Sequence, residues 1–103
     1  MEEKHPHYKR ILVKLSGEAL SNGERGILNY DFLEEVGKTI KKCVDMGTQV
    51  SIVVGAGNIW RGARQGGLTI DRVRGDHMGM LATVINSLAM QDYLIAAGVD
   101  ARV

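Results

Sequence analysis

VVGAGNIWRG, residues 53–62, begins as an apolar run and then places small residues, an asparagine, a tryptophan and an arginine directly after it. With the residues before it, the run predicts a buried strand over Thr48–Gly55. Glycines after such a strand let backbone N–H groups approach a ligand closely, and Arg61 adds a bidentate positive charge. The stretch therefore favours an anion site at a strand end over its alternative, a tight turn with an exposed arginine.

The rest of the chain alternates strand and helix around this stretch. Continuous apolar runs predict strands buried on both faces of a parallel sheet, and apolar residues at helical spacing predict helices. The first half is expected to hold a strand Arg10–Leu15, a long loop over 16–29, and a helix that starts near Asn29 or Asp31 and stops at Gly47, with a capping box formed by Asp31 and Glu34. The second half is expected to hold the strand Thr48–Gly55, a helix from about Asp76 to Ala97, and a third strand Val99–Val103. This order predicts an α/β fold built on a right-handed βαβ unit.

The helix expected near the C-terminus has an unusual composition. Between His77 and Ala97 its only charged residue is Asp92, and apolar side chains occupy nearly all of its sides. A helix that is apolar all round is buried all round. One side can pack on the sheet, whereas the free side, to which we assign Met90, requires a partner: a C-terminal half of the protein, a second subunit, or both.

Length and composition limit the function classes. With 103 residues the chain forms one domain at most, and its net charge of +1 gives no strong attraction to nucleic acid or to acidic membranes. It has a single cysteine, Cys43, and no apolar run long enough to span a bilayer. We therefore expect a cytoplasmic protein with neither nucleic-acid nor membrane partners.

Three stretches carry candidate chemistry, and each lies where a strand ends or a helix begins, the region in which open α/β sheets bind ligands. Neither the phosphate loop GxxxxGK[ST] nor the dinucleotide fingerprint GxGxxG is present. The three stretches are KLSGE (14–18), GAGN (55–58) with Arg61, and GDHMGMLAT (75–83).

Each stretch has a functional and a purely structural interpretation. Lys14, at the end of a buried strand, is costly unless it meets an anion, but it can also extend to solvent before an ordinary turn. Asn58 can cap a following helix whose N-terminus binds a phosphate. Asp76 is either a plain N-cap of the long helix or a carboxylate that accepts hydrogen bonds from a sugar.

Together, YKRILVKLSGEAL (8–20), VVGAGNIWRG (53–62) and RVRGDHMGMLATVINSLAM (72–90) resemble the bacterial uridylate kinases, or UMP kinases, of the amino acid kinase superfamily. GDHMGMLAT is the most specific of these segments. The resemblance implies a three-layer α/β sandwich with a mostly parallel sheet, of which residues 1–103 form the N-terminal, UMP- and phosphate-binding part. It also implies transfer of the γ-phosphoryl group of ATP to UMP, giving UDP, with Mg²⁺ bound to the ATP.

The resemblance assigns roles residue by residue. It implies that Lys14 and Arg61 are catalytic. It implies that ATP contacts Lys14, Leu15, Ser16, Gly17, Gly57 and Arg61, that UMP contacts Ala56 and Asp76, and that none of these residues binds a metal. The loop over Asn22–Ile27 matches a segment tied to GTP activation in some members.

The resemblance also implies a homo-oligomer. Family members are hexamers built from dimers, and the helix that matches Asp76–Ala97 lies at their dimer contact.

Two alternatives to a UMP kinase stay open. One is another superfamily member that shares the first two segments, such as an acetylglutamate, aspartate or carbamate kinase; the other is a non-catalytic nucleotide-binding fragment.

Overall fold

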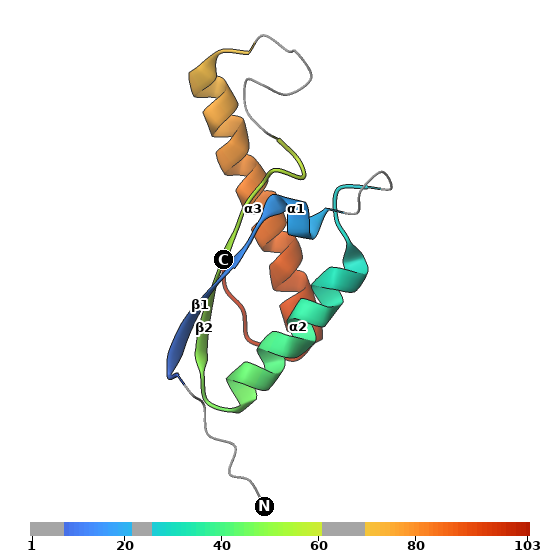
Figure 1. Ribbon diagram of the computed structural model, residues 1–103, viewed down its shortest axis with the longest axis vertical. Coiled ribbons are helices and arrows are strands. Elements are labelled where there is room, and N and C mark those ends of the chain that lie inside the picture. The colour runs from blue at the N-terminus through green and yellow to red at the C-terminus, as the bar shows by residue number, and fades with distance from the viewer. Residues whose placement is uncertain (1–7, 22–25, 61–69) are drawn as a thin grey trace, which may run out of the picture.

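The computed structural model describes residues 8–21, 26–60 and 70–103. The elements, in chain order, are strand β1 (Arg10–Leu15), helix α1 (Gly17–Leu20), helix α2 (Tyr30–Asp45), strand β2 (Gln49–Val54) and helix α3 (Arg72–Ala96). Figure 1 shows the two strands side by side, with α1 at the end where they stop and α2 and α3 packed against them. The expected α/β class, a small parallel sheet with flanking helices, is confirmed.

Both long helices cover the same face of the sheet. β1 and β2 pair in parallel, with Leu15 opposite Val54, and alternate residues of each strand pack into a core that α2 and α3 complete. On the other face, Leu12 and Val53 are 67% and 51% exposed. The expectation that these strands are buried on both faces is therefore wrong for the described residues, because none of the described elements covers the second face.

Residues Val99–Val103 do not form the predicted third strand, and the sheet of the described residues has two strands. The Val99 N–H donates to the Leu94 carbonyl at 2.9 Å, and the Ala101 carbonyl accepts from Gln91 Nε2 at 3.0 Å. These two backbone groups therefore bond to α3 rather than to a neighbouring strand, and β2 pairs only with β1 among the described residues. The segment returns along the sheet as an extended chain (Figure 1).

Helix α2 begins at one of the two expected caps. Asn29 Oδ1 accepts from the Phe32 N–H at 3.1 Å, so Asn29 is the N-cap. The expected capping box of Asp31 and Glu34 is wrong, because Asp31 already lies inside the first helical turn. The helix ends as predicted before Gly47, whose φ of +94° suits a glycine at this position.

The loop expected over 16–29 contains the one-turn helix α1. Its last residue, Leu20, is fully buried and belongs to the core. That core also holds Leu33, Ile40, Val54, Met90, Leu94 and Val99. Helices α2 and α3 approach closely at Gly37, where an added Cβ would lie 3.1 Å from the Tyr93 carbonyl oxygen.

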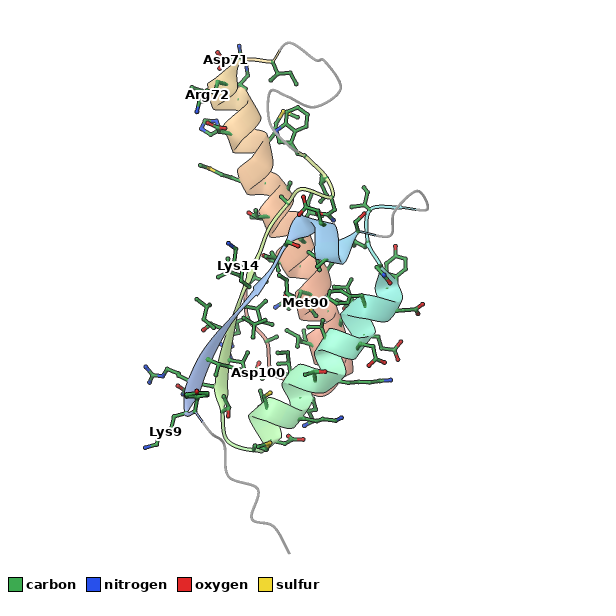
Figure 2. All side chains as sticks on the ribbon, in the orientation of Figure 1. Lys9, Lys14, Asp71, Arg72, Met90 and Asp100 are labelled. Atoms are coloured by element: carbon green, nitrogen blue, oxygen red, sulfur yellow. The ribbon has the colours of Figure 1, made fainter. Side chains whose placement is uncertain are left out.

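Helix α3 begins four residues earlier than expected. Asp71 is its N-cap and accepts from the Arg74 N–H at 3.3 Å. Figure 2 shows Asp71 and Arg72 at the far end of α3, beyond the ends of the strands. None of the helices in the described ranges combines the length and hydropathy that a membrane crossing requires.

One side of α3 is buried and the opposite side is open. The buried residues recur every four positions: Ala82, Asn86, Met90 and Leu94. The open side carries large apolar residues that are 46–66% exposed, which we call the free stripe: Leu81, Val84, Ile85, Leu88 and Ile95. An open apolar side is confirmed, but the assignment of Met90 to it is wrong, because Met90 is 2% exposed and packs in the core.

Candidate phosphate site at the strand ends

The candidate site starts where the two parallel strands end together. Leu15 and Val54 are in register, and the Gly55 N–H donates to the Leu15 carbonyl at 2.8 Å. Ligands of open α/β sheets bind outside the carboxyl ends of the strands. The KLSGE and GAGN stretches therefore leave the sheet at the same edge, next to each other.

The backbones of these two stretches touch. A Cβ added to Gly17 would collide with the backbone nitrogen of Gly57 and lie 2.8 Å from that of Asn58, and one added to Gly55 would lie 2.9 Å from the Gly17 nitrogen. Neither Gly17 nor Gly55 has a positive φ, so close approach, not backbone conformation, requires glycine at these positions.

This contact gathers backbone nitrogens of Gly17, Gly57 and Asn58 in one place. Within the described ranges, neither the Gly57 nor the Asn58 N–H has a hydrogen-bond acceptor. Successive N–H groups of this kind form a concavity that binds anions. These two N–H groups are therefore candidates for binding an anion at this edge of the sheet.

The KLSGE residues take different positions around this edge. Ser16 is the N-cap of α1, and its Oγ accepts from the Ala19 N–H at 3.1 Å, which leaves its own hydroxyl proton to donate. Leu15 packs into the core, so it offers the site only backbone. Lys14 is exposed and extends from the sheet face that α2 and α3 leave bare (Figure 2).

The expectation that Lys14 lies at the end of a buried strand is wrong for the described residues. The strand end is not buried on the Lys14 side, so desolvation does not require an anion there. Ile11, Val13 and Leu15 face the covered side of the sheet, and Lys14 faces the open side. Because Lys14 is only one residue before the end of β1, its long side chain can still extend to a ligand at the strand end.

The GAGN turn has ordinary backbone angles. No described non-glycine residue has a positive φ, and this includes Ala56. The Ala56 carbonyl accepts from both the Ile59 and the Trp60 N–H at 2.9 Å. Ala56 therefore adopts a backbone conformation that alanine accepts without strain.

Among the described residues, which stop at Trp60 on this side, Asn58 caps no helix, and its side chain bonds to other parts of the chain. Its Nδ2 donates to the Ile27 carbonyl at 3.0 Å and to Asn86 Oδ1 at 3.2 Å, while Asn86 Nδ2 donates to Asn58 Oδ1 and to the Gly55 carbonyl, both at 2.8 Å. The amide thus joins the turn to α3 and to residue 27.

Trp60 joins the same turn to the first half of α3. Its Nε1 donates to the Gly75 carbonyl at 2.7 Å, and a Cβ added to Gly79 would lie 3.7 Å from its Cδ1. Gly75 and Gly79 are one helical turn apart, so the GDHMGM segment presents its small residues to the indole. This contact joins the turn to the part of α3 that contains Asp76.

Asp76 is inside α3 and is not its N-cap. Its side chain is exposed, and its carboxylate makes no ion pair with the described side chains. The structure thus brings Ser16, Gly17 and Gly55–Asn58 together directly, whereas Asp76 is linked to the turn only through the bond of Trp60 to the neighbouring Gly75. Arg61 and most of the Asn22–Ile27 loop lie outside the described residues.

The described residues offer no metal centre of their own. Across 8–21, 26–60 and 70–103, no three His, Cys, Asp or Glu side chains are grouped so that they could hold an ion. This set of described donors does not fit a metal that is bound by protein ligands alone.

Sequence reasoning missed Asn86 and the contact of Trp60. A signal for Asn86 was present, because it is a polar residue inside the nearly uncharged run MLATVINSLAM (80–90). A buried amide must find hydrogen-bond partners, and those partners are in a distant turn. The distance in sequence, 28 residues to Asn58, hides them from a reading based on local periodicity.

Comparisons with known proteins identify several that are similar to this chain. The model of the amino acid kinase family matches residues 9–103. A uridylate kinase of Parabacteroides distasonis is 52% identical over 96 residues, which is 93% of this chain and 41% of that protein.

Two solved structures share the fold. The UMP kinase of Bacillus anthracis superposes with a TM-score of 0.76 at 46% identity, covering 89% of this chain and 37% of its own. The UMP kinase of Ureaplasma parvum gives 0.82 at 38% identity, covering 90% and 41%. This chain therefore spans about two fifths of the length of the relatives that it matches.

Proposed function

The chain belongs to the amino acid kinase family, and on that premise we propose that it is the N-terminal part of a UMP kinase. The complete enzyme, by which we mean the longer protein of this proposal, transfers the γ-phosphoryl group of ATP to UMP. The observation that carries the proposal is the backbone contact of Gly17 with Gly57 and Asn58 at the carboxyl edge of the sheet. It is supported by the 52% identity to a uridylate kinase.

Phosphoryl transfer needs little covalent chemistry from the protein; it depends on positioning and on charge stabilisation. In the proposal, the N–H groups of Gly17 and Gly57 hold phosphate oxygens, and the Ser16 hydroxyl and the Leu15 backbone border the ATP phosphates. Lys14 neutralises charge that develops on the moving phosphoryl group.

The remaining assigned residues complete the two substrate sites. We propose that Arg61 adds a second positive charge at the reaction centre. Ala56 presents its backbone to the UMP phosphate, and Asp76 accepts hydrogen bonds from UMP. The Trp60–Gly75 hydrogen bond supports this pairing, because it connects the turn that bears Ala56 with the helix that bears Asp76.

We propose that Mg²⁺ enters with ATP, and we assign it no ligand in this chain. When bound, it neutralises charge on the phosphates. The enzyme is proposed to be cytoplasmic and to work without nucleic-acid or membrane partners.

The free stripe supports a proposal about assembly. Burying one Leu, Ile or Val side chain contributes roughly 1.5–3 kcal/mol, and the free stripe leaves five of them more than 45% exposed. We propose that a second copy covers this stripe, as one step in building a hexamer.

Transfer of labelled phosphate from ATP to a panel of acceptors tests the proposed reaction. The complete enzyme should label UMP in preference to CMP, AMP and acetylglutamate. Labelling of acetylglutamate without UMP would instead identify a different member of the family. An enzyme that binds ATP and labels none of the acceptors would support the non-catalytic alternative.

A further inference from the structure

Asn86 is the most completely enclosed polar side chain of the described residues. It has no exposed surface, although it lies in the middle of a helix whose neighbouring buried positions are Ala82, Met90 and Leu94. An unpaired amide in such surroundings is costly. Here no buried side-chain nitrogen or oxygen lacks a partner among the residues that the structure describes.

Among the described residues, all hydrogen-bond partners of the Asn86 side chain lie in the GAGN turn. Asn86 Nδ2 donates to the Gly55 carbonyl and to Asn58 Oδ1, each at 2.8 Å, and Oδ1 accepts from Asn58 Nδ2 at 3.2 Å. The first bond holds the residue at which the chain leaves β2. The reciprocal pair holds the residue whose backbone nitrogen faces Gly17.

The network reaches one segment further. Asn58 Nδ2 also donates to the Ile27 carbonyl at 3.0 Å, so one amide pair fixes the end of β2, the turn and the chain that leads into α2. Fully satisfied networks of this kind make a local structure rigid. A turn that must present N–H groups to a phosphate needs that rigidity, because pre-positioned dipoles require no reorganisation during the reaction.

We infer that Asn86 is a positioning residue of the phosphate site: it holds the Gly55–Asn58 turn against α3, so that the backbone N–H groups of the turn face the KLSGE loop. The expected effect on kcat/KM for UMP rests on the proposed function. The expected effect on the rigidity of the turn does not. Asn86 touches no substrate in this account and acts through Gly55 and Asn58.

The test compares Asn86→Ala with Leu94→Ala in the complete enzyme. Both residues are buried on the same side of α3, and both variants lose stability, but of the two only Asn86 has a side chain that hydrogen-bonds to the turn. At a temperature where both variants are folded, Asn86→Ala should lower kcat/KM for UMP by about 10²-fold, because misplacement of binding groups by about 1 Å has this effect. Leu94→Ala should stay within about threefold of the wild type.

A second readout is independent of catalysis. Hydrogen exchange of the Ile59 and Trp60 amides, which bond to the Ala56 carbonyl, should be faster by about tenfold or more in Asn86→Ala, while exchange in α2 is unchanged. Asn58→Ala should reproduce this change, and the double variant should add little to either single variant, because both remove the same link.

The outcomes separate the inference from the proposed function. Loss of kcat/KM and faster exchange in the turn, both specific to the Asn86 and Asn58 variants, support the inference. Equal kcat/KM and equal exchange in Asn86→Ala and Leu94→Ala would overturn it. If the wild type does not phosphorylate UMP, the proposed function fails and the exchange comparison alone decides. If Asn86→Ala does not fold, Asn86→Ser and Asn58→Ala decide by the same two readouts.

Discussion

Replacing Gly17 with alanine tests the contact on which the site is built. The new Cβ would lie 2.8 Å from the Asn58 nitrogen and closer still to that of Gly57, whereas carbon and nitrogen atoms in contact are about 3.5 Å apart. The KLSGE loop and the GAGN turn must therefore separate by about 1 Å. Overpacking of this size costs about 1–3 kcal/mol, and the displacement should lower kcat/KM by about 10²-fold.

Gly79→Ala is the matched control. Its Cβ would lie 3.7 Å from Trp60 Cδ1, an ordinary contact, and alanine is favoured over glycine in a helix by about 1 kcal/mol. Steady-state kinetics with ATP and UMP, together with thermal unfolding of both variants, measure the two effects. Gly17→Ala with the kcat/KM and melting temperature of the wild type would refute the reasoning, because it would mean that the two backbones are not in contact.

Three further predictions concern other parts of the chain. Lys14→Ala should lower kcat by about 10²-fold with little change in UMP binding, which kinetics and calorimetry measure; an unchanged kcat would make Lys14 a plain surface lysine. Leu88→Glu, in the free stripe, should shift the complete enzyme to smaller species in light scattering, and an unchanged mass would contradict the proposed contact. Burial, reinforced by Tyr30 and nearby carboxylates, raises the pKa of Tyr93 above 10.0. The folded state then holds this proton more tightly than the unfolded state, so the stabilisation is present below pH 10 and lost above it. Tyr93→Phe should reduce the loss of stability as the pH rises above 10, measured by denaturant unfolding, and an identical loss in both proteins would count against this.

Much of the fold follows from local pattern. The apolar runs of β1 and β2, the cap at Asn29 and the stop at Gly47 are all set by neighbouring residues, and the structure confirms them. The one-turn helix α1 was not predicted, because its four residues are too few to show a helical period. The third strand was not confirmed, because a strand depends on a partner and the sequence of Val99–Val103 does not reveal one.

The candidate site could be located from the sequence but not assembled. The glycines at 17 and 55 mark close approaches, yet only the fold shows that they approach each other. From the sequence, the side chain of Asn58 was predicted to cap a helix, whereas in the structure it pairs with Asn86 of α3. Met90 could not be assigned to a side of α3 by composition alone, because both sides are apolar and only the position of the sheet decides which is buried.

A crystal structure of the complete enzyme with UMP and a non-hydrolysable ATP analogue tests the central claim most directly. If the contact of the two turns is the phosphate site, phosphate oxygens should lie within about 3.2 Å of the backbone nitrogens of Gly17 and Gly57. The Asn58 amide should remain paired with Asn86. Phosphates bound elsewhere, with these nitrogens facing only solvent, would contradict the account.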